Sequence, residues 1–408
     1  MQSFTIKRLG HQADGIADGP NGDIYVPFTL PGEVVQGVLS GDRLTDMRVL
    51  TSSPDRIKPP CVHFKTCGGC ALQHVSDAFL ATWKIEVVKT ALTAQGLSAR
   101  FLPIETSPPQ SRRRATFSAR RTKKGKMVGF HGRASDSLVE ISGCQLLHPD
   151  LIAGLPAFAA ITRIGATRSA SISLAVTQSE NGLDVDVKQA KPTDGPMLME
   201  LGALTERLKL ARLSWNGETI ASRIAPTQRF QTATVTPPPD AFLQATAHGQ
   251  AALTKAVLAA IGPAKRVADL FAGCGTFTLP LAKLAAVHAV ESDAAALAAL
   301  DVGWRKAVGL KTITTQTRDL FRRPLEPSEL DRFDAVVLDP PRAGAKAQVE
   351  ALATSKVPCI AAVSCNPVTF ARDAATLIAG GYRLDWVQVV DQFRWSPHVE
   401  LVGSFTRA

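Results

Sequence analysis

Apolar and polar positions alternate over short distances at the start of the chain. From Thr5 to about Leu50, alternating stretches such as 23–27 and 33–35 are interrupted by glycine and proline. This pattern is typical of short strands joined by tight turns. It predicts a small β-barrel, an architecture that often binds oligonucleotides.

The last third of the chain has a longer period. Helix-length, alanine-rich stretches alternate with short apolar runs at 266–270, 286–290, 335–338 and 359–363. Helices that alternate with short buried strands predict βαβ units and a mainly parallel, doubly wound sheet.

Proline-rich stretches at 53–60 and 237–239 separate these two patterns from a middle segment. That segment mixes helical stretches with strand-like runs at 170–176 and 183–187, which predicts a mixed α+β domain. The expected domains are 1–52, 53–235 and 236–408.

Seven cysteines change this picture, because an odd number in a chain without an export signal argues against a disulfide framework. Cys61, Cys67 and Cys70 lie within ten residues around Gly68-Gly69, and Cys144 stands alone downstream. Four thiolates suit an iron-sulfur cluster or a tetrahedral zinc ion. Because three ligands are local and one is distant, we favour a [4Fe-4S] cluster over zinc or over buried, unliganded cysteines.

Charge points to a polyanionic partner. Lys and Arg outnumber Asp and Glu by 46 to 36, which gives a formal charge of +10. No acidic residue occurs from Ser111 to Ala134, and this stretch contains nine basic residues. They are Arg112, Arg113, Arg114, Arg120, Arg121, Lys123, Lys124, Lys126 and Arg133. We expect this segment to contact RNA phosphates, with Phe117 and Phe130 as stacking faces; the alternative is a solvated basic hairpin.

No apolar run approaches the roughly 18 residues that a membrane span needs, and no basic, apolar leader opens the chain. We therefore expect a soluble, cytoplasmic protein without a membrane partner.

A glycine-rich turn follows the first apolar run of the C-terminal segment. Residues 267–277 read as strand, turn and helix, and Glu291 follows the next apolar run. Glycines let a ligand approach the backbone there, and an acid after the second strand accepts hydrogen bonds from ribose hydroxyls. A nicotinamide dinucleotide is a rival ligand, but Thr278 stands where its fingerprint needs a third glycine.

Two further strand ends carry reactive groups. Asp339 follows the apolar run 335–338 and precedes Pro340-Pro341, and Cys365 follows 359–363 and precedes Asn366-Pro367. Ligands of open α/β sheets bind at these carboxyl ends. We expect the helix that begins at Pro367 to lower the pKa of the Cys365 thiol, whereas Cys359, inside its apolar run, is structural.

These motifs resemble the RNA uracil-C5 methyltransferases, and most closely the branch with an iron-sulfur cluster that acts on 23S rRNA. The resemblance covers nearly the whole chain. It rests on 15–33, which looks like an RNA-binding TRAM barrel, on 53–74 with Cys144, and on 269–277, 339–342, 364–367 and 398–400.

The resemblance implies an α/β, Rossmann-like class I methyltransferase domain, preceded by a TRAM-like barrel and a central α+β domain that holds the cysteine cluster. The implied enzyme is a monomer that uses S-adenosylmethionine to methylate carbon 5 of a uridine in RNA. The substrate that it implies is 23S rRNA, with tRNA as the alternative.

The resemblance also assigns residues. Cys365 corresponds to the nucleophile and Glu400 to the general base. Positions that contact the cofactor correspond to Gln244, Phe271, Thr276, Glu291, Asp319 and Asp339. Alternatively, Gln244 is a surface helix residue and Asp319 a helix cap. The chain departs from the family at Arg394-Trp395-Ser396, where Pro and Thr are usual, and at Thr246, where Asn is common.

The chemistry needs these residue types. A thiolate that adds to carbon 6 of uracil makes carbon 5 nucleophilic, and a base must later remove the proton from carbon 5. The nucleotide has to leave its stack to be reached. A non-catalytic iron-sulfur RNA-binding protein would not need Cys365 and Glu400 together. A methyltransferase for a base amine would use Asp339 but no thiolate.

Overall fold

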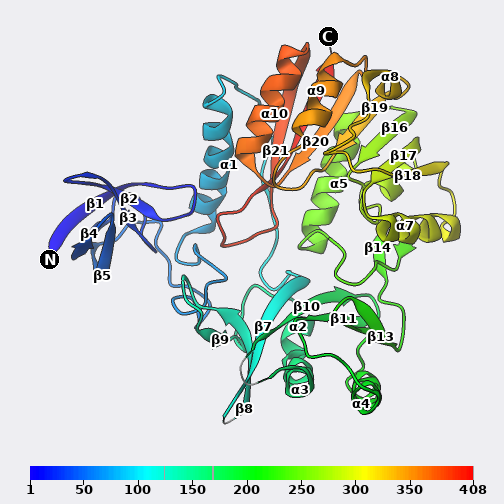
Figure 1. Cartoon of the computed structure of the whole chain (residues 1–408). Helices are drawn as coiled ribbons and strands as arrows, with labels where there is room; N and C mark the ends of the chain where they lie inside the picture. Colours follow the sequence, from blue (N-terminus) through cyan, green and yellow to red (C-terminus); the bar gives the residue numbers. More distant parts are fainter. Residues whose placement is uncertain (124, 168–169, 408) are drawn as a thin grey trace.

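The computed structural model describes residues 1–123, 125–167 and 170–407. Three bodies are visible in it: a small barrel at the N-terminus, a central sheet with helices, and a larger α/β sheet that contains the C-terminus (Figure 1). Lys124, one of the nine basic residues, lies outside the described ranges.

Five strands close the N-terminal barrel in the order β1-β2-β3-β5-β4. They are β1 (Gln2–Leu9), β2 (Gly15–Gly19), β3 (Gly22–Val26), β4 (Val34–Ser40) and β5 (Arg43–Thr51). Alternate side chains such as Ile6, Ile24 and Val35 fill its interior, because successive residues of a strand face opposite sides. The small barrel predicted from the alternating stretches is confirmed.

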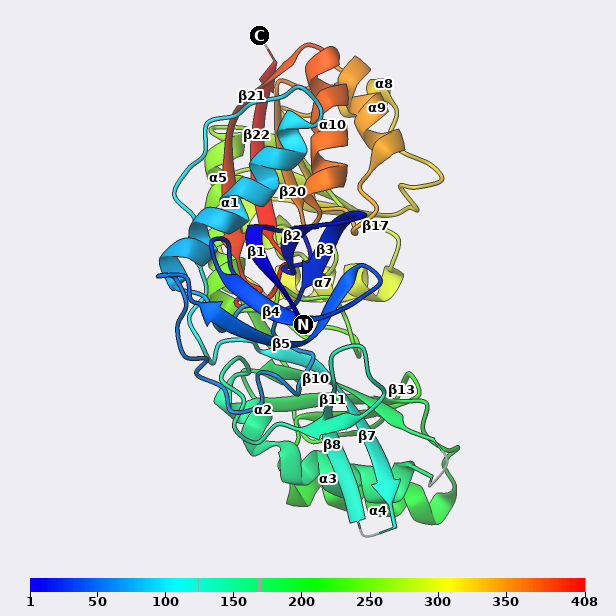
Figure 2. The same ribbon diagram turned by 90° about the vertical axis from the view of Figure 1, so that its left-hand side faces the viewer.

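The central sheet has seven strands in the order β13-β12-β11-β10-β7-β8-β9. They are β7 (Arg114–Thr122), β8 (Gly125–His131), β9 (Leu138–Glu140), β10 (Ile172–Ser179), β11 (Gly182–Lys188), β12 (Arg212–Trp215) and β13 (Glu218–Ser222). The helices are α2 (Pro149–Ala153), α3 (Leu155–Gly165) and α4 (Gly195–Arg207). Both views show α3 and α4 on the same side of this sheet (Figures 1 and 2).

Phe117 is part of the core under this sheet. It is fully buried, its ring is stacked on Phe130 at 5.3 Å, and it packs on Phe158 of α3 at 5.0 Å. The expectation that Phe117 offers a stacking face to RNA is therefore wrong, because strand alternation turns it inward with its apolar neighbours.

The C-terminal sheet has eight strands in the order β18-β17-β16-β19-β20-β22-β21-β6. They are β6 (Glu105–Thr106), β16 (Arg266–Leu270), β17 (Ala286–Glu291), β18 (Ile313–Thr317), β19 (Ala335–Leu338), β20 (Cys359–Ser364), β21 (Tyr382–Asp391) and β22 (Glu400–Arg407). Strands β16 to β20 are parallel, and β22 is antiparallel to both neighbours. The predicted apolar runs are confirmed as β16, β17, β19 and β20.

Helices cover both faces of this sheet. They are α5 (Ala247–Ile261), α6 (Thr278–Leu281), α7 (Ala294–Lys306), α8 (Pro327–Leu330), α9 (Lys346–Thr354) and α10 (Pro367–Ala379). One core lies under α5 and α7, and the other lies under α9 and α10. The strand order reverses between β16 and β19, which in doubly wound sheets is the place where ligands bind.

Parts of the middle segment also pack on the C-terminal sheet. Helix α1 (Asp77–Thr93) contacts α10 and β21 and places Val88 and Leu92 in their core, and it lies beside α10 in both views (Figure 2). The hairpin of β14 (Gln228–Phe230) and β15 (Ala233–Val235) packs against α7. The proline run at 237–239 thus lies in a connection of the chain, but elements that precede it also pack on the C-terminal sheet and its helices.

Candidate functional site

A cavity of about 560 Å³ lies where β16, β17, β19 and β20 end at their carboxyl side. Residues that come from distant parts of the C-terminal segment meet there. The predicted site residues that line it are Phe271, Glu291, Asp319, Asp339, Cys365 and Glu400.

The glycine-rich turn shapes one wall of the cavity. Gly273 has φ +53°, and a Cβ added there would meet no protein atom within 4 Å, so its backbone faces open space. Its N–H donates to Oε2 of Glu291 at 3.1 Å, and the N–H of Ser292 donates to Oε1 at 2.6 Å. A ligand can therefore lie directly against the backbone, beside a carboxylate that can accept hydrogen bonds from hydroxyls.

Two carboxyl groups lie beneath this turn. Asp269 is fully buried, accepts a hydrogen bond from Thr278 Oγ1 at 2.5 Å, and has a pKa that burial raises to about 7. Burial, followed by the charges of Glu400 and Asp269, raises the pKa of Asp339 well above its ordinary value. Burial thus makes both carboxyl groups keep their protons to higher pH than exposed carboxyl groups do.

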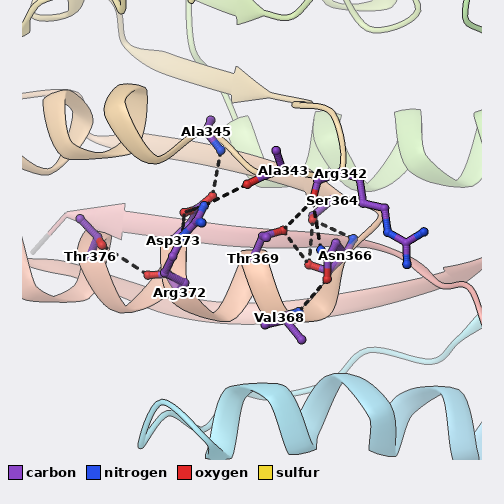
Figure 3. Close-up of polar contacts among 10 residues, drawn as sticks. All are labelled: Arg342, Ala343, Ala345, Ser364, Asn366, Val368, Thr369, Arg372, Asp373 and Thr376. Carbon is purple, nitrogen blue, oxygen red and sulfur yellow. Dashed lines mark hydrogen bonds and ion pairs between the residues drawn. The ribbon is translucent and has the colours of Figure 1, made fainter. Parts of the chain in front are cut away.

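Hydrogen bonds from Asn366 fix the turn that carries Cys365. The Asn366 side chain accepts from the N–H of Val368 at 3.1 Å, and it donates to the carbonyl oxygen of Arg342 at 3.0 Å (Figure 3). It therefore caps α10 and ties that helix to the turn after β19. As a result, Cys365 and Asp339 both face the cavity.

The Cys365 thiol does not have the lowered pKa that was expected. Burial, then the nearby charges of Glu400 and Asp339, raise its pKa to about 11, against a smaller lowering by Arg342. The expectation was wrong because it considered only the helix N-terminus. Desolvation and the charges of two carboxyl groups oppose the thiolate more strongly than the helix N-terminus favours it.

Glu400 belongs to a buried network of amides. Gln392 Nε2 donates to Oε2 of Glu400 at 2.9 Å and to Oε1 of Gln244 at 2.6 Å. Gln244 Nε2 in turn points to Oδ2 of Asp339 at 3.5 Å. Burial raises the pKa of Glu400 to about 7, and the hydrogen bond from Gln392 opposes this rise.

The loop between β21 and Glu400 is anchored from outside the C-terminal segment. Lys84 of α1 is fully buried, forms an ion pair with Asp391, and donates to the carbonyl oxygen of His398 at 2.9 Å. The carbonyl oxygen of Trp395 accepts hydrogen bonds from the N–H groups of Ala71 and Leu72, next to Cys70. Trp395, in the stretch that departs from the family, is thus part of the contact between this loop and the cysteine segment.

Three further residues predicted to contact the cofactor are Gln244, Asp319 and Thr276. Gln244 is buried and bonded within the network, so it is not a surface helix residue. Asp319 lines the cavity and also accepts from the N–H of Phe321 at 2.9 Å, so it caps a turn as well. Thr276 is not among the described residues that line the cavity.

Sequence reasoning missed several residues in and beside the cavity. Gln392, which bonds to Glu400 but is not among the described residues that line the cavity, showed no signal of its own. Arg318 and Phe321 come from the connection after β18, where no motif marked them. Phe242, exposed at the cavity, belongs to a stretch whose Gln244 was predicted.

The four cysteines predicted to bind a metal, Cys61, Cys67, Cys70 and Cys144, line one small pocket. Burial raises the pKa of Cys70 to about 12, and N–H groups of Gly69 and Leu146 donate to the sulfurs of Cys67 and Cys144, each at 3.4 Å. However, within the described residues no group of three or more His, Cys, Asp or Glu side chains is arranged to hold a metal ion. The iron-sulfur cluster therefore stays a prediction.

The inner arginines of the basic segment have protein partners. Arg113 donates to the carbonyl oxygen of Gln244 at 3.2 Å and to Oε1 of Gln250 at 2.7 Å. Arg114 forms an ion pair with Asp240 at 2.9 Å. These side chains join the central sheet to the C-terminal segment. The expectation that every basic residue of the segment contacts RNA is therefore wrong for Arg113 and Arg114.

The outer part of the segment is different. Arg133 forms an ion pair with Asp14 of the barrel and Arg112 is largely buried near Cys70, whereas the described basic residues near the tip of the β7–β8 hairpin are exposed. The described basic residues at this tip are Arg120, Arg121, Lys123 and Lys126. RNA contact stays a prediction for these four residues.

The comparisons with known proteins agree on one class. A family model described as tRNA (uracil-5-)-methyltransferase matches residues 231–407. An uncharacterised RNA methyltransferase of Brucella suis is 47% identical over 404 residues, which are 99% of this chain and 97% of that protein. A 23S rRNA (uracil(1939)-C(5))-methyltransferase of Chromohalobacter salexigens is 32% identical over 99% of this chain and 89% of its own.

A solved structure supports the fold. The tRNA (uracil-54, C5)-methyltransferase of Pyrococcus abyssi, in complex with S-adenosyl-L-homocysteine, matches with a TM-score of 0.78 at 23% identity over 99% of both chains. This likeness confirms the class I methyltransferase fold expected for the C-terminal segment. No helix in the described ranges is both long and apolar enough to cross a membrane.

Proposed function

Because the chain belongs to the RNA uracil-C5 methyltransferase family and depends on S-adenosylmethionine, we propose that it methylates carbon 5 of a uridine in 23S rRNA through Cys365 and Glu400. The observation that carries this proposal is the meeting of a thiol, two carboxyl groups and a glycine-rich turn around one cavity. An amine methyltransferase would have no use for the thiol.

The cavity suits the cofactor. We assign the ribose hydroxyls to Glu291, and the open backbone at Gly273 to the close approach of the ligand. Phe271 and Phe321, whose rings lie 5.4 Å apart at the cavity, are suited to contact the adenine ring. The bound cofactor supplies an electrophilic methyl group.

Cys365 adds through its sulfur to carbon 6 of the uracil, and the electrons of the C5–C6 double bond move toward carbon 5 and the carbonyl at carbon 4. Carbon 5 would then take the methyl group that the cofactor supplies, as the bond between that methyl group and sulfur breaks and S-adenosylhomocysteine leaves. Glu400 next removes the proton from carbon 5, the C5–C6 double bond forms again, and the Cys365 thiolate leaves. Because a thiol with a pKa of about 11 is protonated at neutral pH, the first step also needs a base, and Asp339 and Glu400 face the same cavity.

We assign RNA contact outside the cavity to the tip of the β7–β8 hairpin. Arg121 lies directly opposite Lys126 across the two strands. Like charges in that position destabilise a hairpin by repulsion, and a bound phosphate removes the repulsion. A polyanion is therefore the partner that this pair suits.

We further propose that Cys61, Cys67, Cys70 and Cys144 hold a [4Fe-4S] cluster. A single zinc ion needs sulfurs at about 2.3 Å, whereas a larger cluster separates its ligands and fits four cysteines around one pocket. Anaerobically purified protein should contain about four irons and four sulfides per chain, and Cys144→Ala should lose them while Cys359→Ala keeps them. One zinc per chain would contradict the assignment.

The choice of rRNA follows the relative from Chromohalobacter salexigens, which matches over 99% of this chain. The test is to incubate the protein with labelled S-adenosylmethionine and, separately, unmodified 23S rRNA and tRNA. We expect label at carbon 5 of one uridine in 23S rRNA. Label only in tRNA would show that tRNA, and not 23S rRNA, is the substrate. Label on an exocyclic amine would refute the proposed reaction.

A further inference from the structure

Gln392 occupies the centre of the buried network beside Glu400. Its side chain is 1% exposed and its oxygen accepts a hydrogen bond from the N–H of Ala245 at 2.8 Å. Because a backbone N–H can only donate, this bond fixes which end of the amide is the oxygen. The amide nitrogen therefore has to face Glu400 and Gln244, with one hydrogen for each.

The orientation of Gln392 sets that of its neighbour. The oxygen of Gln244 accepts from Gln392 at 2.6 Å, so the nitrogen of Gln244 is directed to Asp339, 3.5 Å away. One backbone N–H thus orients two amides in succession. Both present donors to the carboxyl groups of the cavity, and a donor favours the ionised form of a carboxyl group.

We propose that Gln392 is a positioning residue, which holds Glu400 ionised and oriented in the cavity and links it through Gln244 to Asp339. The inference rests on the proposed role of Glu400 as the base. Because the nitrogen of Gln392, and not its oxygen, faces Glu400, Gln392 cannot accept a hydrogen bond from a protonated Glu400. Burial raises the pKa of Glu400 and the bond from Gln392 opposes that effect.

A substitution at Gln392 removes none of the other charged groups near the cavity, and among them only Asp339 is linked to Gln392, through Gln244. These groups are Cys365 after β20, Asp339 after β19, Asp269 on β16, Arg342 and His398 near the cavity, and the Lys84–Asp391 pair. A shift in pH dependence on replacing Gln392 can therefore be assigned to the lost amide.

Gly249 offers a second way to disturb the same residue. A Cβ at Gly249 of α5 would lie 2.6 Å from Cβ and 2.9 Å from Oε1 of Gln392. The same Cβ would lie 2.9 Å from Oγ1 of Thr246, which caps α5, so Gly249→Ala disturbs the packing around Gln392 while the amide is kept. Gln392→Met removes the bond to Glu400, and Gly249→Ala is expected to weaken it.

The experiment follows tritium released from carbon 5 of [5-³H]uridine-labelled RNA in a single turnover across pH. Gln392→Met has a side chain of similar length but no donor. It should shift the rising limb of the rate of tritium release against pH by about one unit to higher pH. Release should then be about tenfold slower than in the parent at about pH 6 and close to the parent at high pH. Gly249→Ala should shift the limb the same way. Gln388→Met, on β21 just before Gln392 but bonded to Pro103, should leave it unchanged.

The inference would be overturned if folded Gln392→Met or Gly249→Ala lost tritium release equally at every pH. An unshifted rising limb of the pH profile would also overturn it. Its failure can be told from failure of the proposed function, because Glu400→Gln tests the base separately. If Glu400→Gln accumulates a covalent RNA adduct and the limb of Gln392→Met is unshifted, only the role of Gln392 is refuted.

Discussion

The cavity and the β7–β8 hairpin both concentrate charge, but in opposite surroundings. Asp339 and Glu400 are acidic groups at the cavity, and burial raises the pKa of each. Arg121 and Lys126 are basic and exposed at the hairpin tip. A buried group changes its protonation with its neighbours, whereas exposed charges add to one another and are screened by salt. The cavity is therefore suited to chemistry, and the hairpin to binding.

The comparison predicts that the largest effect comes from Cys365. Cys365→Ala should lower methylation by about 10⁴-fold or more, because the covalent route loses its nucleophile. Cys359→Ala is the matched control, since Cys359 begins β20, the strand that Cys365 follows, and is not among the described residues that line the cavity. Methyl transfer to RNA measures both; comparable losses in the two variants would contradict the assignment.

The pH dependence should be the next largest effect. Glu400, with its pKa at about 7, acts as a base only when it is ionised, so activity is present above that pKa and is lost as pH falls through it. Tritium release from carbon 5 should fall about tenfold per unit at acidic pH. A flat profile through the neutral range in the parent enzyme would exclude Glu400 as the limiting base.

The inner arginines sharpen the comparison because they carry charge but are buried. Arg113→Ala should lower the free energy of unfolding by about 2 kcal/mol, since it removes bonds to Gln244 and Gln250 and leaves buried acceptors. Denaturant unfolding measures this loss. If Arg113→Ala had unchanged stability but bound RNA more weakly, Arg113 would be a residue that contacts RNA after all.

The hairpin tip should give the smallest effect on catalysis. The double variant Arg121→Ala/Lys126→Ala should weaken RNA binding about tenfold or less and reduce the slope of log affinity against log salt by about 1.5 to 2. Lys265→Ala/Lys356→Ala removes equal exposed charge just before β16 and β20, at the amino ends of these strands, and serves as the control. Equal slopes in the two double variants would refute the hairpin surface.

Local patterns predicted the positions of strands and the residues at their ends. Asp339 and Cys365 were found because parallel strands bring their carboxyl ends to one edge. The fate of the arginines was not predictable, because charge counts do not show that Arg114 meets Asp240 from a distant segment. Likewise, the pKa of Cys365 depends on Glu400 and Asp339, which only the fold brings near.

Gln392 shows the same limit at the centre of the site. Its partners Gln244 and Glu400 are predicted residues, yet their separation in the chain gave no sign of the shared network. Trp395 and Arg394 looked like a departure from the family, and the structure shows that this stretch contacts Ala71 and Asp77. Contacts across segments decide these roles.

The covalent adduct tests the central claim most directly. Glu400→Gln, incubated with 23S rRNA and S-adenosylmethionine, should accumulate a denaturation-resistant complex of protein and methylated RNA, because the proton at carbon 5 cannot leave and Cys365 stays attached. The double variant Glu400→Gln/Cys365→Ala should form none. Normal turnover without an adduct in Glu400→Gln would contradict the pairing of Cys365 with Glu400.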